Sequence, residues 1–227
     1  MNNIKKPKER KMEIKKDTSL EAWKQTLKTI MEKGQSIIDE EKRQSKEILN
    51  IIIKIRHPEQ DITTPIEIMR SLKKWVYPDL EELRDVFFKK EASSLYYYTY
   101  GARIFNYSHN LDQVEEYVIP LLKKDPSTRR AAIILYHPVI DSKITMKENP
   151  SLVAIFFKIR KNKLDTTTVL RSNDMFIGWP ANIYQVYLLQ KYIASQLGIE
   201  TGNITTISHS AHIFEEYKKE VEEILRE

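Results

Sequence analysis

Apolar residues in the first half of the chain recur at helical spacing. A helix is expected from Ser19, which can cap its N-terminus, to Gly34, which can end it. Its apolar side is formed by Leu20, Trp23, Leu27, Ile30 and Met31. Further expected helical segments are 40–55, closed by His57 and Pro58; 80–90, started by Pro78 and Asp79; and 111–124, bent or ended near Pro120.

The second half of the chain changes to strand-like patterns. The run 131–137 is continuously apolar, which is typical of a strand buried on both faces. Residues 151–160 and 164–171 flank Lys161-Asn162, a pair that favours a hairpin turn. A β-branched strand is expected at 203–210. Long helical patterns are expected at 180–198, with proline at the start and glycine at the end, and at 214–227.

This succession of helices, then strands around one long helix, predicts the α+β class. We expect a single domain at residues 17–227, because no repeat and no linker rich in Gly, Ser or Pro divides it. Residues 1–16 are basic and lack an apolar core, so we expect a disordered, solvated arm rather than a secretory signal. A weak contact of this arm with nucleic acid or membrane is the less favoured interpretation.

Composition narrows the classes of function. The chain has 227 residues, of which 41% are hydrophobic and 30% charged, as in soluble globular proteins. No apolar run reaches the ~18 residues of a membrane span. The chain has no cysteine, which excludes disulfides, thiolate metal sites and thiol nucleophiles, and we expect a cytoplasmic location. The net charge of +5 fits a phosphorylated small ligand as well as nucleic acid, but no basic stripe interleaved with aromatic residues favours nucleic acid.

Two arginine-containing motifs are candidates for anion binding. Arg129 and Arg130 precede an expected strand, and their planar guanidinium groups suit bidentate phosphate recognition. Neighbouring side chains on an extended segment point in opposite directions, so one could serve this subunit and the other a neighbour. On these residues alone, a surface ion-pair cluster is the favoured alternative. Arg171 and Ser172 lie at the end of another expected strand, a common place for a binding site.

Several other polar residues have both structural and functional interpretations. Asn182 lies in the first turn of a long helix, where an amide either caps the helix or reads a ligand. His209 and His212 are three residues apart, but the strand pattern there disfavours a metal pair. The tyrosine run at 96–98, followed by Tyr100, is typical of a strand in the core, and one hydroxyl could reach a ligand.

Ser151 follows Pro150 at the start of an apolar strand. Taken alone, it is most simply a polar residue at a strand start. A hydroxyl there could also cap a turn or act as a nucleophile.

Five segments, taken in order, resemble the thymidylate synthase family, which includes the pyrimidine nucleotide hydroxymethylases. They are YTYGARI, DQVEEYVIPLLKKDPSTRRAAI, NPSLVAIFFKIRKNKL, RSNDMFIGWPANIYQVYLLQKYIA and ISHSAHIF. Together they cover roughly residues 95–217, and the first 90 residues match only loosely. The order and spacing of the motifs make the resemblance specific. The short, archaeal-type branch is the most similar in length and in the ISHSAHIF motif.

The resemblance implies a homodimer with a mixed β-sheet packed with helices. It implies a pyrimidine nucleoside monophosphate as ligand (UMP, dUMP, CMP or dCMP), 5,10-methylenetetrahydrofolate or a related folate as cofactor, and no metal. By position, Arg171 and Ser172 would hold the phosphate of their own subunit. Arg129 and Arg130 would reach the same phosphate across the dimer, and Arg43 is the expected N-terminal phosphate arginine.

The resemblance also assigns roles around the base and the cofactor. Asn182 would read the pyrimidine edge, as in the uracil-reading members, although an amide can present either edge by flipping. Asp174 would contact the folate pterin, with Gly178 lining the same cleft. Tyr100 would lie near the nucleophile, and His212 would bond the sugar hydroxyl.

The departures from the family pattern concern catalysis. Ser151 takes the place of the nucleophilic cysteine, at the preserved distance from the RS motif, and Leu152 stands where many members have histidine. Serine is a poor nucleophile without a base, so a large loss of rate is expected if the mechanism is unchanged. Phe214 lacks the hydroxyl of the family tyrosine. The catalytic glutamate is assigned to Glu82, with Glu81 as the alternative.

Three hypotheses follow for the function. The first is a C5 one-carbon transferase for methyl or hydroxymethyl transfer, in which Ser151 is an introduced or a natural replacement of cysteine. The second is a divergent nucleotide hydrolase or glycosidase that uses Ser151 or a water. The third is a non-catalytic nucleotide-binding homologue. The retained arginines and Asn182 disfavour a purely structural role but do not separate the three.

Overall fold

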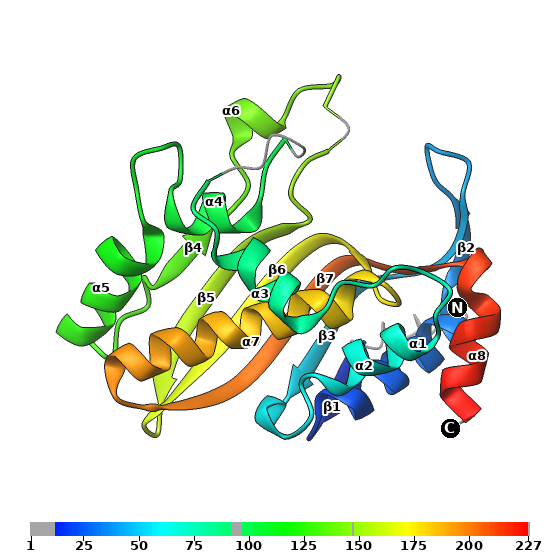
Figure 1. Cartoon of the computed structure of the whole chain (residues 1–227), viewed down its shortest axis with the longest axis horizontal. Helices are drawn as coiled ribbons and strands as arrows, with labels where there is room; N and C mark the ends of the chain where they lie inside the picture. Colours follow the sequence, from blue (N-terminus) through cyan, green and yellow to red (C-terminus); the bar gives the residue numbers. More distant parts are fainter. Residues whose placement is uncertain (1–11, 92–96, 147, 227) are drawn as a thin grey trace, which may run out of the picture.

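The computed structural model describes residues 12–91, 97–146 and 148–226 (Figure 1). One mixed sheet forms the centre of the molecule, with the strand order β1-β3-β7-β6-β5-β4 and with β2 paired to β3. The strands are β1 (Glu13–Lys16), β2 (Gln35–Ile38), β3 (Gln44–Ile55), β4 (Ala132–Ile134), β5 (Leu152–Arg160), β6 (Lys163–Asp174) and β7 (Glu200–Phe214). The sheet and its helices confirm the α+β class.

The α-helices vary widely in length. They are α1 (Ser19–Lys33), α2 (Thr64–Ser71), α3 (Leu80–Phe88), α4 (Tyr100–Phe105), α5 (Ile119–Lys124), α6 (Pro138–Asp141), α7 (Gly178–Leu197) and α8 (Lys218–Arg226). A π-helical turn, Gln113–Val118, leads into α5, and short 3-10 turns lie at Pro58–Gln60 and Glu215–Tyr217. The longest helix, α7, crosses one face of the sheet (Figure 1).

The capping and turn residues in the sequence correctly predicted where several helices and strands begin or end. Helix α1 spans the expected segment, although Thr18 rather than Ser19 is its N-cap. Asp79 caps α3, and α7 ends at Gly198 in the left-handed conformation, with φ +67°. The hairpin between β5 and β6 is confirmed: Lys161 and Asn162 have φ values of 50° and 58°, as a type I′ turn requires.

Two sequence-based expectations for the N-terminal part are wrong. The stretch 40–55 is a strand, β3, not a helix, because its run of isoleucines buries every second side chain: Ile51, Ile53 and Ile55. The arm was expected to extend to residue 16, but Glu13–Lys16 form β1 and pair in parallel with β3. Residues 1–11, the rest of the expected arm, lie outside the described part of the chain.

Two expectations for the middle of the chain also need correction. The apolar run 131–137 contributes only the three-residue edge strand β4, and Ile134 is 42% exposed because its side chain lies on the same open face of the sheet as Phe156. Tyr100 begins helix α4 instead of forming a strand, because Thr99 accepts a hydrogen bond from Ala102 as an N-cap. Tyr96 lies outside the described residues.

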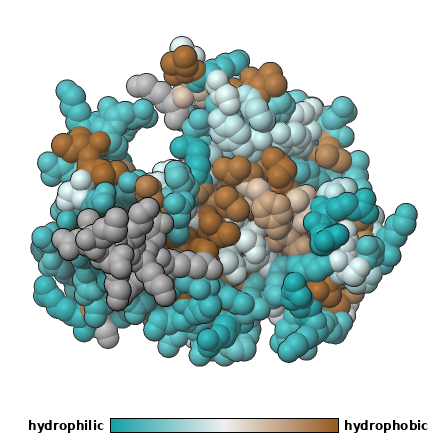
Figure 2. Space-filling view, turned by 180° about the vertical axis from the view of Figure 1, so that it is seen from behind, coloured by the Kyte–Doolittle hydropathy of each residue, from teal (hydrophilic) through white to brown (hydrophobic). Residues whose placement is uncertain are grey.

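One face of the sheet is covered by helices, and the other is open over its middle. The covered face carries the buried apolar clusters beneath α1, α7 and α8 and beneath α4 and α5. On the open face, Ile52, Val169 and Ile207 are paired neighbours and are only partly buried. Phe156, on the adjacent row, is 44% exposed. Figure 2, a view of the molecule from behind, shows an apolar patch in the middle of this side.

A row of irregular residues crosses three strands of the sheet. Asn50 of β3, with φ 56°, lies opposite His209 of β7, which in turn lies opposite Arg171 of β6. The side chains of Asn50 and His209 share a hydrogen bond of 3.0 Å. In β6 and β7 the alternation of buried and accessible positions slips by one residue at this row, as at aligned β-bulges. As a result, both Arg171 and Ser172 are accessible.

Candidate functional site

A cavity of about 540 Å³ brings together residues from distant parts of the sequence. Ser151 at the start of β5, Tyr100 at the start of α4 and Arg171 of β6 all line it. Three of the residues predicted from sequence therefore meet in one place. The remaining lining residues are Val86, Tyr98, Thr99, Glu148, Asn149 and Gln185.

Arg171 holds the segment that carries Ser151. Its Nε donates to the carbonyl of Pro150 at 3.0 Å, and one terminal nitrogen donates to the carbonyl of Asn149 at 2.8 Å and to its side-chain oxygen at 2.6 Å. The backbone N–H of Arg171 also donates to the carbonyl of Ser151 at 2.9 Å. The other terminal nitrogen of the guanidinium forms no hydrogen bond within the described chain, so it is free to meet a ligand.

Tyr100 supports the same segment at Leu152, the residue after Ser151. Its hydroxyl accepts a hydrogen bond from the backbone N–H of Leu152 at 3.2 Å. Burial raises the pKa of Tyr100, so its phenol stays protonated at neutral pH and can donate a hydrogen bond to a bound molecule. The pKa of Tyr98, whose ring lies 5.8 Å from that of Tyr100, is raised by burial as well.

A second cavity, of about 350 Å³, lies at the ends of β3, β6 and β7. Ser172 and His212, which were predicted to bind phosphate and sugar, line this cavity together with Phe214. Consecutive residues of β6 thus open to different cavities, Arg171 to the first and Ser172 to the second. The other lining residues are Ile37, Asp39, Glu40, Glu41, Ser45, Glu47 and Ser210.

Asp174 and His212 are partners in the pairing of β6 with β7. One carboxylate oxygen of Asp174 accepts the backbone N–H groups of Phe176 and Ile177, at 2.9 and 3.0 Å. Burial raises the pKa of Asp174 and lowers that of His212. The negative charge of Asp174 partly offsets the effect of burial on His212. At neutral pH the imidazole is therefore neutral, with one donor and one acceptor nitrogen.

The Asp174→Asn substitution is expected to lower the pKa of His212 further. Asparagine keeps the size of the side chain but removes the negative charge that favours the imidazolium. An NMR titration of the His212 ring measures the change. Glu200→Gln, at the opposite end of β7, is the control and should leave the titration unchanged. A rise in the His212 pKa on Asp174→Asn would contradict the electrostatic assignment.

Asn182 lines neither of the two cavities. It lines a small gap of about 10 Å³ with Leu152, Leu170 and Trp179. The indole N–H of Trp179 in this gap is buried and has no hydrogen-bond partner in the described structure. A Cβ on Gly178 would lie 3.8 Å from the side-chain nitrogen of Asn182, so this glycine borders the amide. The gap is too small for a ring.

The other residues predicted to take part in catalysis or phosphate binding do not line the cavity that contains Ser151. The Glu82 carboxylate accepts the backbone N–H of Asp79 at 2.9 Å in the capping box of α3. Arg43 binds Glu216 at 2.6 Å, and its guanidinium lies 3.4 Å from the ring centre of Phe214, beside the second cavity. Arg129 and Arg130 are exposed just before β4. The catalytic and phosphate-binding roles of these residues remain predictions.

The sequence analysis missed several residues that line the cavities. Glu148 and Asn149 directly precede Pro150 and Ser151, so their position in the chain was an available signal. Gln185 was missed because it lies among the apolar core positions of α7. Its side-chain nitrogen donates to the carbonyl of Leu83 at 2.9 Å. Glu47 was missed because its segment was expected to be a helix.

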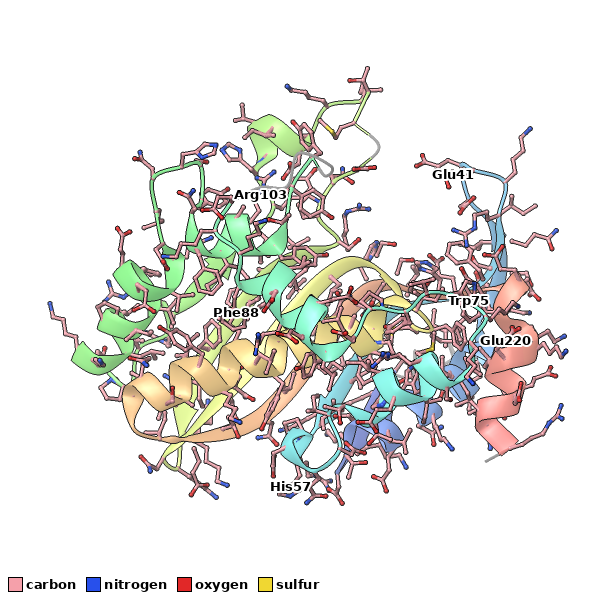
Figure 3. All side chains as sticks on the ribbon, in the orientation of Figure 1. Glu41, His57, Trp75, Phe88, Arg103 and Glu220 are labelled. Atoms are coloured by element: carbon pink, nitrogen blue, oxygen red, sulfur yellow. The ribbon has the colours of Figure 1, made fainter. Side chains whose placement is uncertain are left out.

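A buried polar network supports the loop before Ser151. Arg103 of α4, labelled in Figure 3, forms a 2.7 Å ion pair with Asp141 of α6, whose side chain is fully buried. The other carboxylate oxygen of Asp141 accepts the backbone N–H of His137 at 2.6 Å. The side-chain nitrogen of Asn149 donates to the Asp141 carbonyl at 3.3 Å, which connects the network to the Ser151 cavity.

The described residues offer neither a metal site nor a membrane-spanning helix. They contain no group of three or more His, Cys, Asp or Glu side chains arranged to hold a metal ion. His209 and His212 lie on one strand and face different surroundings, the former exposed and the latter half-buried. Among the described helices, none has the length and apolar character needed to cross a membrane.

Comparison with known proteins defines the class. The thymidylate synthase family model matches residues 85–227. A protein of Methanosarcina acetivorans named "Putative thymidylate synthase" is 35% identical over 206 residues, which is 91% of each chain. One of the same name from Methanococcoides burtonii is 35% identical over 213 residues, 94% of each chain.

The present chain therefore belongs to the thymidylate synthase family. Its residues are also 35% identical over 112 positions to a deoxyuridylate hydroxymethyltransferase of Bacillus phage SP01, covering 48% of this chain and 29% of the phage protein. Together these matches support a transferase of the thymidylate synthase kind, and they agree with the α+β fold.

Proposed function

We propose that the chain binds a pyrimidine nucleoside monophosphate in a thymidylate synthase-like site built for C5 one-carbon transfer. The observation that supports this most strongly is the meeting of Ser151, Tyr100 and Arg171, from three separate elements, in one cavity. Arg171 fixes the backbone on both sides of Pro150, so residue 151 is presented to the cavity in a defined position. In the family this position carries the nucleophile that adds to C6 of the pyrimidine.

Ser151 limits the chemistry at this position. A hydroxyl must lose its proton to attack C6, and the Ser151 hydroxyl forms no hydrogen bond to a base within the described chain. A cysteine thiol reaches the thiolate state far more easily, because its pKa is about 8.5. We therefore propose that binding and orientation of the nucleotide are preserved while C6 addition is slow.

The phosphate site is proposed to be shared across a homodimer. One guanidinium nitrogen of Arg171 forms no hydrogen bond with the described residues, whereas Arg129 and Arg130 are exposed and distant in sequence. The open, partly apolar face of the sheet offers a surface on which a second copy can pack (Figure 2). Packing there would let the exposed arginines of one subunit meet the phosphate bound by Arg171 of the other.

A reduced folate is the proposed cofactor, and Asp174 fits a role in holding it. One oxygen of its carboxylate is taken by two backbone N–H groups, and the other forms no hydrogen bond with the described residues. A free carboxylate oxygen can accept from the N–H groups of a pterin ring. The folate would supply the one-carbon unit, and Asp174 would orient it.

Two alternatives each have an observation in their favour. The absence of a base hydrogen-bonded to Ser151 among the described residues suits a non-catalytic nucleotide-binding homologue. A hydrolase or glycosidase is the second alternative, since Glu148 places a carboxylate in the same cavity as Ser151. A carboxylate there can activate a water.

Mixed dimers test the shared phosphate site. In the proposed arrangement, Arg171→Ala and Arg129→Ala homodimers each lose both sites. A heterodimer of the two variants keeps one intact site, formed by Arg171 of one subunit and Arg129 of the other. Calorimetric titration with UMP, dUMP, CMP and dCMP should then give one site per heterodimer. Arg226→Ala, at the end of α8, is the control that should keep both sites.

Two outcomes would count against this arrangement. One is normal nucleotide binding by the Arg129→Ala homodimer, which would remove that residue from the site. The other is a purified heterodimer that binds none of the four nucleotides, although the unsubstituted protein binds one of them.

A further inference from the structure

The second cavity has a composition that restricts what can bind in it. Its wall combines carboxylates from the β2–β3 hairpin and β3 with hydroxyls from β6 and β7. Glu41, at the tip of the hairpin, is labelled in Figure 3. The volume, about 350 Å³, is large enough for a five-membered sugar and its substituents.

Glu47 occupies a central position in this wall. It is the pairing partner of His212 across β3 and β7. One of its carboxylate oxygens accepts the hydroxyl of Ser210 at 2.5 Å. The other oxygen forms no hydrogen bond with any residue that the structure describes. An ionised carboxylate only accepts hydrogen bonds, so a group that completes this site must be a donor.

Ser45 gives an independent indication of a ligand. It is 2% exposed and lines the same cavity from β3. Its hydroxyl has no hydrogen-bond partner within the described part of the chain. Because this hydroxyl borders the cavity, a group bound there can pair with it. A ligand with hydroxyl groups would satisfy Ser45 and Glu47 together.

The charge of the cavity argues against a phosphate in this place. Asp39, Glu40, Glu41 and Glu47 all contribute carboxylates. Arg43 lies nearby, but it is already paired with Glu216 and stacked on Phe214. An anion would meet like charges, whereas a neutral hydroxyl would meet acceptors. The group suited to this cavity is an uncharged sugar.

We infer that Glu47 accepts a hydrogen bond from the 2′-hydroxyl of a ribonucleotide, and that the site therefore prefers ribose to deoxyribose. This inference rests on the proposed function, in which His212 binds a sugar hydroxyl. Glu47 lies directly opposite His212, so its free oxygen is placed to meet the hydroxyl on the neighbouring sugar carbon. A carboxylate in this role also holds the ribose hydroxyl in dinucleotide-binding proteins.

The test compares ribonucleotides with deoxyribonucleotides in binding. The unsubstituted protein should bind UMP or CMP roughly 10- to 100-fold more tightly than the deoxy counterpart, the effect of one hydrogen bond to a charged group. Glu47→Ala should bring this ratio close to one by weakening ribonucleotide binding alone. Glu47→Gln keeps an acceptor and the side-chain size, so part of the preference should remain. Glu32→Gln, at an exposed position of α1 outside the cavity lining, is the matched control and should keep the full ratio.

A ratio near one in the unsubstituted protein, or an unchanged ratio in Glu47→Ala, would overturn the inference. A second measurement separates this outcome from failure of the proposed function. Methyl β-ribofuranoside and its 2-deoxy analogue are added while the NMR signals of the His212 ring are followed. Selective shifts by the riboside that disappear in Glu47→Ala support the sugar site even if no pyrimidine nucleotide binds. Absence of such shifts overturns the inference whatever the nucleotides do.

Discussion

The Ser151→Cys substitution is expected to raise hydrogen exchange at pyrimidine C5 by several orders of magnitude. A thiolate at this position adds to C6, which makes C5 carbanion-like and allows its hydrogen to exchange before the thiolate leaves again. The serine hydroxyl has no hydrogen-bonded base among the described residues, so it stays protonated. Release of tritium from 5-tritiated UMP, dUMP, CMP and dCMP, with and without methylenetetrahydrofolate, measures the effect.

The same assay includes a control variant and distinguishes the C5 transferase from the two alternative functions. Ser142→Cys adds a thiol at an exposed position and should leave the rate at that of the unsubstituted protein. Tight nucleotide binding without tritium release, in both the unsubstituted protein and the Ser151→Cys variant, would favour the non-catalytic homologue. Release of free base or of sugar phosphate would favour the hydrolase or glycosidase. Either result would contradict the C5 transferase proposal.

The Asp141→Ala substitution is expected to destabilise the fold by about 3–5 kcal/mol. It leaves the Arg103 guanidinium, whose side chain is only 11% exposed, without its partner, and it also frees the backbone N–H of His137. An unpaired buried charge is far more costly than a missing surface pair. Urea unfolding monitored by circular dichroism gives the free energy of unfolding.

The matched control is another ion pair of nearly the same length. Asp17 accepts from Arg56 at 2.6 Å, but both side chains are more than half exposed. Asp17→Ala should therefore cost about 1 kcal/mol or less, because solvent screens the pair. Equal effects of the two substitutions would show that burial of the Arg103–Asp141 pair does not determine its contribution.

The elements that could be predicted from sequence are those with local signals. The type I′ turn at Lys161-Asn162 and the glycine after α7 require particular backbone conformations, which few residues adopt. The helix prediction for segment 40–55 was wrong because charged residues precede its isoleucines and give a pattern similar to that of an amphipathic helix. Its strand character comes from pairing with β7, a partner about 160 residues away in the sequence.

The residues of the candidate site that belong to sequence motifs could be predicted from the sequence. Ser151, Arg171 and Tyr100 were identified from motif spacing, and they meet in one cavity. The separation of Arg171 from Ser172 could not be foreseen, because it depends on the aligned irregularity that links Asn50 with His209. Glu47 reaches the second cavity only through the register of β3 on β7, which no local pattern encodes.

The central position of β7 has a consequence for synthesis of the chain. This strand, Glu200–Phe214, lies between β3 and β6 and joins the N-terminal strands to the hairpin of β5 and β6. Both neighbouring edges stay unpaired until residues 200–214 have been synthesised. Unpaired strand edges invite association with other chains. A nascent or truncated chain that ends before residue 200 therefore has two open edges, and β7 is the strand that removes both of them.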